Sequence, residues 1–160
     1  NTRARAAWAT AGRLTGAELH APDGRRYAAG DRIVTLAPAA RGAIVTSQRG
    51  VVDHVDVDAR RLWVRMDDGQ LHRLEGDELS ADRLDHGYAV TVHRAQGATV
   101  DTAHRLHDGG GRELAYVAMS RARRHTTIHL VADDLDQAAE DLRRDWRHAL
   151  VLPRFDGHVA

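Results

Sequence analysis

Apolar residues follow two different spacings along this chain, one typical of helices and one typical of strands. Near the start, four apolar residues fall on one face of a helix that we predict over residues 1–12: Ala4, Ala7, Trp8 and Ala11. Asn1 or Thr2 is in place to cap this helix. Residues 14–27 are polar and rich in turn formers, with a turn expected at Pro22-Asp23-Gly24.

From Gly30 onward apolar and polar residues alternate, which is the spacing of strands in a half-buried sheet. The alternation predicts five short strands, over residues 30–36, 42–46, 51–57, 60–66 and 70–74. Asp67-Asp68-Gly69 is a strong hairpin signal between the last two strands. Short strands at regular spacing, with glycine at the turns, indicate a small β-barrel. Residues 75–84 are expected to form a polar connector.

Helical and strand spacings alternate in the second half, as in an α/β sheet domain. The predicted elements are a helix over 88–96 ended by Gly97, a strand over 100–106, a helix over 112–123 and a strand over 126–132. The 112–123 helix is apolar almost all round and the strand after it is a near-continuous apolar run, so we expect both to be buried. The pattern predicts an α/β fold: part of a parallel sheet with flanking helices, interrupted by the small barrel.

A last helix is expected to begin at Asp133 or Asp134 and to end at Pro153. Its apolar face would consist of Leu135, Ala138, Ala139, Leu142, Trp146 and Ala149. The residues after Pro153 are expected to form a loose tail.

The amino-acid composition excludes several classes of protein. The 160 residues suffice for one modest domain, or for a small domain with an insertion, and the formal net charge is zero. The absence of cysteine excludes disulfides and zinc–thiolate sites, and no apolar run has membrane-spanning length. We therefore expect a cytoplasmic protein with no membrane partner. Every positive side chain is arginine, whereas a Walker A phosphate-binding loop requires lysine. If the chain belongs to an ATPase, it supplies only part of it.

Arg121 is the strongest candidate for a functional side chain. It follows Leu114, Val117 and Ala118 on one face of the predicted 112–123 helix. A guanidinium at the end of an apolar stripe must meet an anion or open onto a cleft, and its planar fork suits a γ-phosphate. The alternative is a structural ion pair with an acidic residue, such as Asp101 or Asp133.

Polar residues also surround the glycine at position 97. Thr91, His93 and Gln96 precede it and Thr99 follows it. Such side chains can face a ligand that approaches the backbone closely, and Thr91 and His93 can donate to DNA phosphates. An ordinary helix C-cap is the alternative interpretation.

Other features carry weaker signals. The Gly109-Gly110-Gly111 run is typical of a flexible loop rather than of a phosphate cradle. The histidine pairs 104/107 and 125/129 lack an accompanying carboxylate set, so we expect no metal site. Arg41 and Arg49 flank a loop of the predicted barrel that is free of acidic residues, which leaves open a nucleic-acid contact or a solvated surface.

Taken together, residues 88–101 (YAVTVHRAQGATVD) and 114–123 (LAYVAMSRAR) resemble motifs V and VI of superfamily 1 helicases. The resemblance is to the RecD-like branch, including the helicase part of conjugative relaxases of the TraA/TrwC type. The motif V pattern is occupied by Thr91, His93, Arg94, Gln96 and Gly97. Arg94 stands where lysine is usual, and Thr99 stands where many relatives have an acidic residue that holds the ribose. The motif VI pattern is intact, and Arg121 falls on the arginine-finger position.

The resemblance implies the second RecA-like domain of an ATP-dependent translocase on single-stranded DNA, with an SH3-like barrel inserted. Its implied parts are residues 1–29 and 81–152 for the RecA-like domain, 30–80 for the barrel and 153–160 for the tail. ATP with Mg would be bound jointly with the N-terminal RecA-like domain of the parent chain, which supplies the Walker motifs. The fragment alone should therefore not hydrolyse ATP.

The resemblance also implies a role for each candidate residue. Arg121 would be catalytic, and the cofactor-binding set would be Gly97, Thr99, Arg121 and Arg124. The DNA-binding set would be Thr91, His93, Arg94, Gln96, Arg41 and Arg49. The alternatives are a non-catalytic nucleic-acid-binding module built around the barrel, and a degenerate domain that retains only the family shape.

Overall fold

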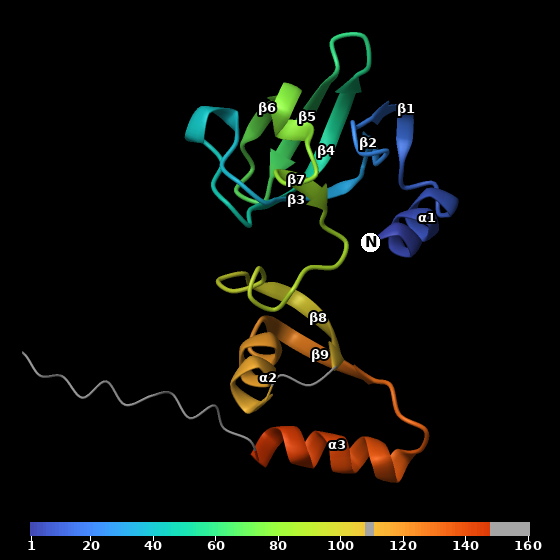
Figure 1. The fold of residues 1–160 in the computed structure, drawn as a ribbon, viewed down its shortest axis with the longest axis vertical. Coiled ribbons are helices and arrows are strands. Elements are labelled where there is room, and N and C mark those ends of the chain that lie inside the picture. Colours follow the sequence, from blue (N-terminus) through green and yellow to red (C-terminus); the bar gives the residue numbers. More distant parts are fainter. Residues whose placement is uncertain (108–110, 148–160) are drawn as a thin grey trace, which may run out of the picture. The chain divides into compact units, whose positions relative to one another are not determined.

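The computed structural model describes residues 1–107 and 111–147 (Figure 1). The chain divides into two compact units, a first unit from Asn1 to Val90 and a second unit from Thr91 to Ala160. Each unit has its own sheet, and the two are described in turn.

The first unit is built on a five-stranded antiparallel sheet with the order β6-β5-β4-β3-β7. Its strands are β3 (Arg32–Thr35), β4 (Arg49–Asp56), β5 (Arg61–Met66), β6 (Leu71–Glu75) and β7 (Leu84–His86). The predicted strands over 30–36, 51–57, 60–66 and 70–74 are confirmed. Gly69, at φ 87°, turns the chain between β5 and β6, as its Asp-Asp-Gly sequence predicted. The strands β6 and β7 lie at opposite edges of the sheet and do not pair, so the described residues form no closed barrel.

Alternating residues of this sheet form one hydrophobic core. Leu62 and Val64 of β5 and Leu74 of β6 are fully buried, whereas Arg65 and Arg73 between them are exposed. The cluster comprises Leu19, Ala21, Tyr27, Ile33, Ala39, Ile44, Val52, Leu62, Val64, Met66, Leu74, Leu79 and Leu84. All of these residues belong to the first unit, which therefore has a core of its own.

Three parts of the first unit differ from the sequence prediction. Residues 14–27 contain most of an antiparallel hairpin, β1 (Thr15–His20) with β2 (Arg26–Ala29), instead of turns alone. The hairpin forms because Leu19 and Tyr27 pair across it and are both buried in the core. The strand expected over 42–46 is wrong, since only Ile44 bridges to Ala39 there, after a 3-10 turn at Ala40–Gly42. A second 3-10 turn, Gly76–Leu79, interrupts the expected connector.

The predicted N-terminal helix is confirmed as α1 (Thr2–Thr10), but its buried face is not the predicted one. Ala4 and Ala7 are exposed, whereas Arg5 is buried and forms a bidentate pair with Asp31. Asp31 is fully buried and also accepts the backbone N–H of Ala28 at 2.8 Å. Short alanine side chains bury little area, so the ion pair, and not the apolar stripe, decides the orientation of the helix.

Asp31 and the start of α1 also form hydrogen bonds with the last residues of the first unit. The Tyr88 hydroxyl donates to Asp31, and the backbone N–H of Ala89 donates to Asn1 Oδ1 at 2.8 Å. Asn1 thus binds a distant segment, and its side chain makes no hydrogen bond within its own helix. Burial and the hydrogen bond to Asp31 both raise the pKa of the Tyr88 hydroxyl above its ordinary value. Residues 88 and 89 are therefore fixed by tertiary contacts, which explains why the helix predicted over 88–96 does not form.

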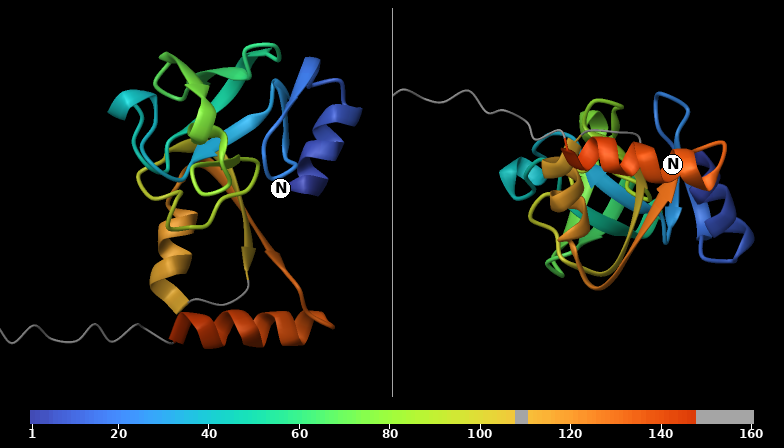
Figure 2. Two further views of the ribbon diagram at one scale, coloured as in Figure 1. Left: turned by 45° about the horizontal axis from the view of Figure 1, so that its top comes forward. Right: turned by 90° about the horizontal axis from the view of Figure 1, so that it is seen from below.

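The second unit contains a two-stranded parallel sheet, β8 (Val100–His107) with β9 (Ala122–Leu130). The helix α2 (Gly111–Met119) lies between these strands in the chain and packs against β8, and α3 (Leu135–Arg147) packs against α2. Figure 2 shows the two strands side by side and running in the same direction. The parallel strands joined through a helix confirm the predicted α/β character.

Burial in the second unit is lower than the sequence predicted. The helix α2 ends at Met119 instead of residue 123, and it exposes Tyr116, with only Ala115 and Ala118 fully buried. No residue of β9 is fully buried, because the described sheet has only one neighbour for this strand. The expectation of a helix and strand buried on all sides is therefore wrong.

The last helix begins where the sequence predicted. Asp134 Oδ1 accepts the backbone N–H of Gln137 at 2.8 Å, which caps the first turn of α3. Leu135 is 88% exposed and does not join the apolar face assigned to it. Ala149, Pro153 and the expected tail over 153–160 lie outside the described residues, as does the side chain of Trp146. Among the residues described, no helix has the length and apolar character needed to cross a membrane.

Candidate functional site

Parallel pairing brings the two motif segments to the same edge of the second unit's sheet. Residues 91–99 lead directly into β8, and Ser120 and Arg121 lead directly into β9. Val100 lies opposite Ala122, and the Val100 N–H donates to the Arg121 carbonyl at 2.9 Å. Because parallel strands begin at the same edge, segments twenty residues apart in sequence become neighbours. Their backbones are joined at the point where both strands start.

The segment before β8 is a series of tight turns rather than a helix. The Ala95 N–H donates to the Thr91 carbonyl at 3.0 Å, and the Gln96 N–H donates to the His93 carbonyl at 3.2 Å. Gly97 has φ 84°, the left-handed conformation that was predicted for it, and a Cβ there would meet no other atom within 4 Å. The requirement for glycine is therefore conformational, and the space beside its Cα is open.

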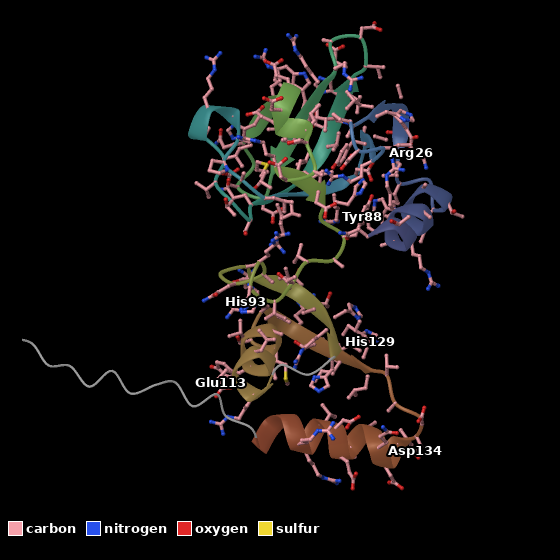
Figure 3. All side chains as sticks on the ribbon, in the orientation of Figure 1. Arg26, Tyr88, His93, Glu113, His129 and Asp134 are labelled. Carbon is pink, nitrogen blue, oxygen red and sulfur yellow. The ribbon has the colours of Figure 1, made fainter. Side chains whose placement is uncertain are left out.

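Side chains of this turn point into solvent. Thr91, His93, Arg94, Gln96 and Thr99 are all exposed, and His93 is labelled in Figure 3 beside the start of β8. Exposed donors on a short turn can bind a ligand without displacing a packed neighbour. The structure thus presents the motif V residues together, although on a turn that the sequence pattern placed in a helix.

Arg121 lies in the turn after α2, not on the buried face of the helix. Its side chain is half-buried, its Nε donates to the Val117 carbonyl at 2.9 Å, and an Nη donates to Ser120 Oγ at 2.9 Å. These contacts use two of its five N–H donors and no carboxylate. Neither Asp101 nor Asp133 forms an ion pair with Arg121 within the described ranges, so that alternative is not seen.

Arg124 lies at an irregularity in β9. Val100 pairs with Ala122, but Thr102 pairs with His125, so one extra residue is accommodated on β9 between these pairs. Arg124 is exposed, and the nearby Thr126 hydroxyl donates to the Met119 carbonyl at 3.2 Å, which ties the strand to the end of α2. Arg121 and Arg124 therefore both lie where β9 begins.

Arg41 and Arg49 belong to the first unit and differ from each other. Arg41 is exposed in a strained turn with φ 56°. Arg49 is half-buried in β4 and forms an ion pair with Asp67 at 3.0 Å. Just before Arg41, the Ala40 N–H donates to Glu78 Oε1 at 2.6 Å. The loop between the two arginines, residues 42–48, contains no acidic residue, as expected.

The histidines of the second unit form one contact that the sequence pattern did not indicate. His104 Nδ1 and His129 Nε2 lie 3.0 Å apart across the parallel strands, with their rings stacked. Within the described residues, no group of three or more metal-ligating side chains gathers. Of the triple-glycine run, Gly109 and Gly110 lie outside the described residues.

No protein-family model matches the chain. It is 36% identical over 108 residues to the conjugal transfer protein TraA of Rhizobium radiobacter, a match that covers 66% of this chain and 10% of TraA. It is 32% identical over 145 residues to the multifunctional conjugation protein TraI of Escherichia coli, covering 84% of this chain and 7% of TraI. An uncharacterized protein of Mycobacterium tuberculosis, Rv2311, is 40% identical over 79 residues, covering 49% of this chain and 42% of that protein.

Among solved structures, a Pif1 helicase studied in DNA unwinding at forked duplex DNA matches 91% of this chain and 42% of its own. The TM-score is 0.50 at 20% identity, which establishes likeness of fold. The chain spans about a tenth or less of the TraA and TraI proteins that it matches. These similarities confirm the predicted resemblance to conjugation proteins of the TraA type, and the fold of the chain resembles part of a Pif1 helicase.

Proposed function

We propose that this chain is the C-terminal part of an ATP-dependent translocase on single-stranded DNA, from a conjugative relaxase-helicase of the RecD-like branch. One observation carries the proposal: the hydrogen bond from Val100 to the Arg121 carbonyl joins the two motif segments at the edge where β8 and β9 begin. A motor must couple its DNA contacts to its nucleotide contacts, so that a change at one is felt at the other. The backbone hydrogen bond between the two segments supports such coupling.

Arg121 has the properties required to contact a nucleotide phosphate. It is half-buried, its direction is set by Val117 and Ser120, and no carboxylate within the described residues neutralises it. A fixed guanidinium of this kind can stabilise the charge that develops on a transferred phosphoryl group. ATP with Mg would supply that group, held jointly with the N-terminal RecA-like domain of the parent chain. Gly97, Thr99 and Arg124 complete the proposed nucleotide side.

The exposed turn before β8 forms the proposed DNA side. Thr91, His93, Arg94 and Gln96 present hydroxyl, imidazole, guanidinium and amide donors to solvent within six residues. Such donors suit phosphate and sugar contacts, which fix a strand without reading its sequence. Arg41 and Arg49 of the first unit are proposed as further DNA contacts, with Arg49 the weaker contributor because Asp67 already neutralises it.

The finer domain assignment is also part of the proposal. Residues 30–80 would be an SH3-like insertion, and residues 1–29 and 81–152 would belong to the RecA-like domain. The support for the insertion is that four of the five antiparallel strands, β3 to β6, lie within these residues, while the fifth strand, β7, lies just after them. The support for the RecA-like part is the parallel β8–α2–β9 unit.

The DNA side is tested with the complete parent chain. We expect the double variant Thr91→Ala/His93→Ala to raise the DNA concentration for half-maximal ATPase by about tenfold, because two phosphate contacts are lost. The saturated turnover should change much less. The matched control is His72→Ala/Thr127→Ala, which removes the same side-chain types outside the turn. Equal DNA requirements for the variant and the control would remove the turn from the DNA track.

The isolated 160 residues give a second test. Without a Walker A lysine they should show no ATP turnover, with or without single-stranded DNA. Measurable turnover that is lost in Arg121→Ala would contradict the division of the active site between two domains.

A further inference from the structure

Two guanidinium groups lie over the indole ring of Trp8 in α1. The Cζ atoms of Arg13 and Arg32 lie 5.4 and 5.8 Å from the ring centroid. Tyr88 contacts the same ring edge-on, with the centroids 5.8 Å apart. Figure 3 shows Tyr88 at the side of α1, where this contact fixes the indole. We call Trp8, Arg13 and Arg32 the Trp8 patch.

Backbone contacts bring the two arginines to the ring from separate parts of the first unit. The Arg13 N–H donates to the Trp8 carbonyl at 3.0 Å, just after the helix ends. Gly30 approaches Arg13 so closely that a Cβ on Gly30 would lie 2.2 Å from the Arg13 carbonyl oxygen. Arg32 follows two residues later as the first residue of β3. The meeting of the two arginines is therefore built into the fold.

Charge distinguishes the Trp8 patch from the ion-paired arginines of the first unit. Most arginines of this unit form ion pairs with carboxylates: Arg5, Arg25, Arg26, Arg49, Arg61, Arg65 and Arg73. Arg13 and Arg32 are exposed, and within residues 1–107 and 111–147 their side chains form no ion pair or hydrogen bond. A cation–π contact orients a guanidinium but leaves its charge and its N–H donors in place.

We propose that the Trp8 patch binds the phosphate backbone of single-stranded DNA, as a contact of the first unit additional to the motif V turn. The inference rests on the proposed function, because it takes the DNA strand as the polyanion. Two oriented, unneutralised guanidiniums match phosphate oxygens in charge and in donor geometry. An aromatic ring beside arginines is also the combination that sequence-independent grooves for single strands use. The patch would contact only a short length of the DNA strand, so it adds affinity for DNA but no sequence specificity.

The test measures binding of a fluorescent oligothymidine to the 160-residue chain across a range of salt concentrations. We expect Arg13→Ala/Arg32→Ala to weaken binding at least about tenfold, because two charge-assisted contacts are lost. The slope of log K against log salt should fall by about 1.4, since each phosphate contact on a single strand contributes about 0.7. Both positions are exposed, and thermal unfolding of each variant checks that the fold is kept.

The matched control is Arg65→Ala/Arg73→Ala, which removes the same charge from exposed arginines that already have carboxylate partners. Wild-type affinity and slope in this control, together with the loss in the patch variant, would support the proposal. Equal losses in both variants, or none in the patch variant, would overturn it. Equal binding of a polyglutamate peptide, or no DNA binding by the wild-type chain, would also overturn it. The proposed function is decided separately by ATP turnover of the parent chain.

Discussion

The two units of the chain bury their apolar residues to very different degrees. The hydrophobic core cluster lies wholly in the first unit, where Leu62, Val64 and Leu74 are fully buried. In the described part of the second unit, only Ala115 and Ala118 are buried apolar residues, and Leu106 is 63% exposed. Buried apolar area is the main stabilising term of a fold. The first unit therefore has a hydrophobic core of its own, whereas the described part of the second unit is sparsely packed.

The two units also differ in whether their arginines are paired with carboxylates. In the first unit most arginines meet carboxylates, and the Arg5–Asp31 pair is buried. At the start of β8 and β9 in the second unit, Arg94 and Arg124 are exposed and Arg121 contacts only a carbonyl and a hydroxyl. Arginines that stabilise a fold are neutralised within it, and arginines that bind a ligand are left without a carboxylate. By this criterion Arg94, Arg121 and Arg124 of the second unit, like Arg13 and Arg32 of the first, are candidates for ligand binding.

The largest effect on stability is expected at the buried ion pair. Arg5→Ala leaves the Asp31 carboxylate buried without its charged partner, which should lower the free energy of unfolding of the first unit by about 3–5 kcal/mol. Arg3→Ala, two residues earlier on the same helix at an exposed position, should cost less than about 0.5 kcal/mol. Urea unfolding followed by tryptophan fluorescence measures both. Similar losses would mean that the pair does not anchor α1.

A second pair of variants tests the difference in packing between the units. Leu62→Ala in the core of the first unit should cost about 2–5 kcal/mol, because it leaves a cavity. Leu106→Ala in β8 should change the free energy of unfolding by no more than about 0.5 kcal/mol, since the side chain is mostly exposed. If Leu106→Ala were as costly as Leu62→Ala, the description of the second unit as sparsely packed would be wrong.

The smallest effect is a pH dependence in the first unit. Burial lowers the pKa of His86 below 6.5, against the opposing hydrogen bond to the Arg26 carbonyl. As the pH falls below about 6.5, the unfolded chain takes up this proton before the folded unit does, so stability decreases towards the folded pKa. His86→Gln should flatten this slope between about pH 7.5 and 5.5. His20→Gln, at an exposed position, should keep the wild-type slope, and a wild-type slope in His86→Gln would contradict the assignment.

Most strands of the fold were predictable because alternation of apolar and polar residues is a local signal. The strands β4, β5 and β6 follow it directly, and so does the Gly69 turn between the last two. The β1–β2 hairpin was missed because its sequence is mostly polar, and Leu19 and Tyr27 reach the core only once the rest of the unit is in place. The face of α1 was mistaken for the same reason, since Asp31 is twenty-six residues from Arg5.

The motif residues of the candidate site could be named from the sequence, but their geometry could not be predicted. Thr91, His93 and Arg121 were identified by the motifs, and none of them lies in the helix that periodicity assigned to it. Residues 88 and 89 form hydrogen bonds with Asp31 and Asn1, and no helix begins there. Arg121 lies past the end of α2 because the chain must turn there into β9. Tertiary contacts of this kind leave no mark on local spacing.

The Trp8 patch also could not be predicted from local sequence spacing. Its three residues come from α1, from the segment after it and from β3, and tertiary contacts such as the close approach of Gly30 to Arg13 bring them together. The sequence pattern placed Trp8 on the apolar face of a helix. The two arginines gave no signal because the formal net charge of the chain is zero.

The central claim is that Arg121 acts on the nucleotide, and DNA-stimulated ATP turnover of the complete parent chain tests it most directly. Arg121→Ala should lower kcat by about a thousandfold or more, with nucleotide binding and thermal stability retained. Arg112→Ala, an exposed arginine at the start of α2, is the matched control and should keep near-normal turnover. Near-normal turnover in Arg121→Ala would contradict the account and leave the chain as a nucleic-acid-binding module.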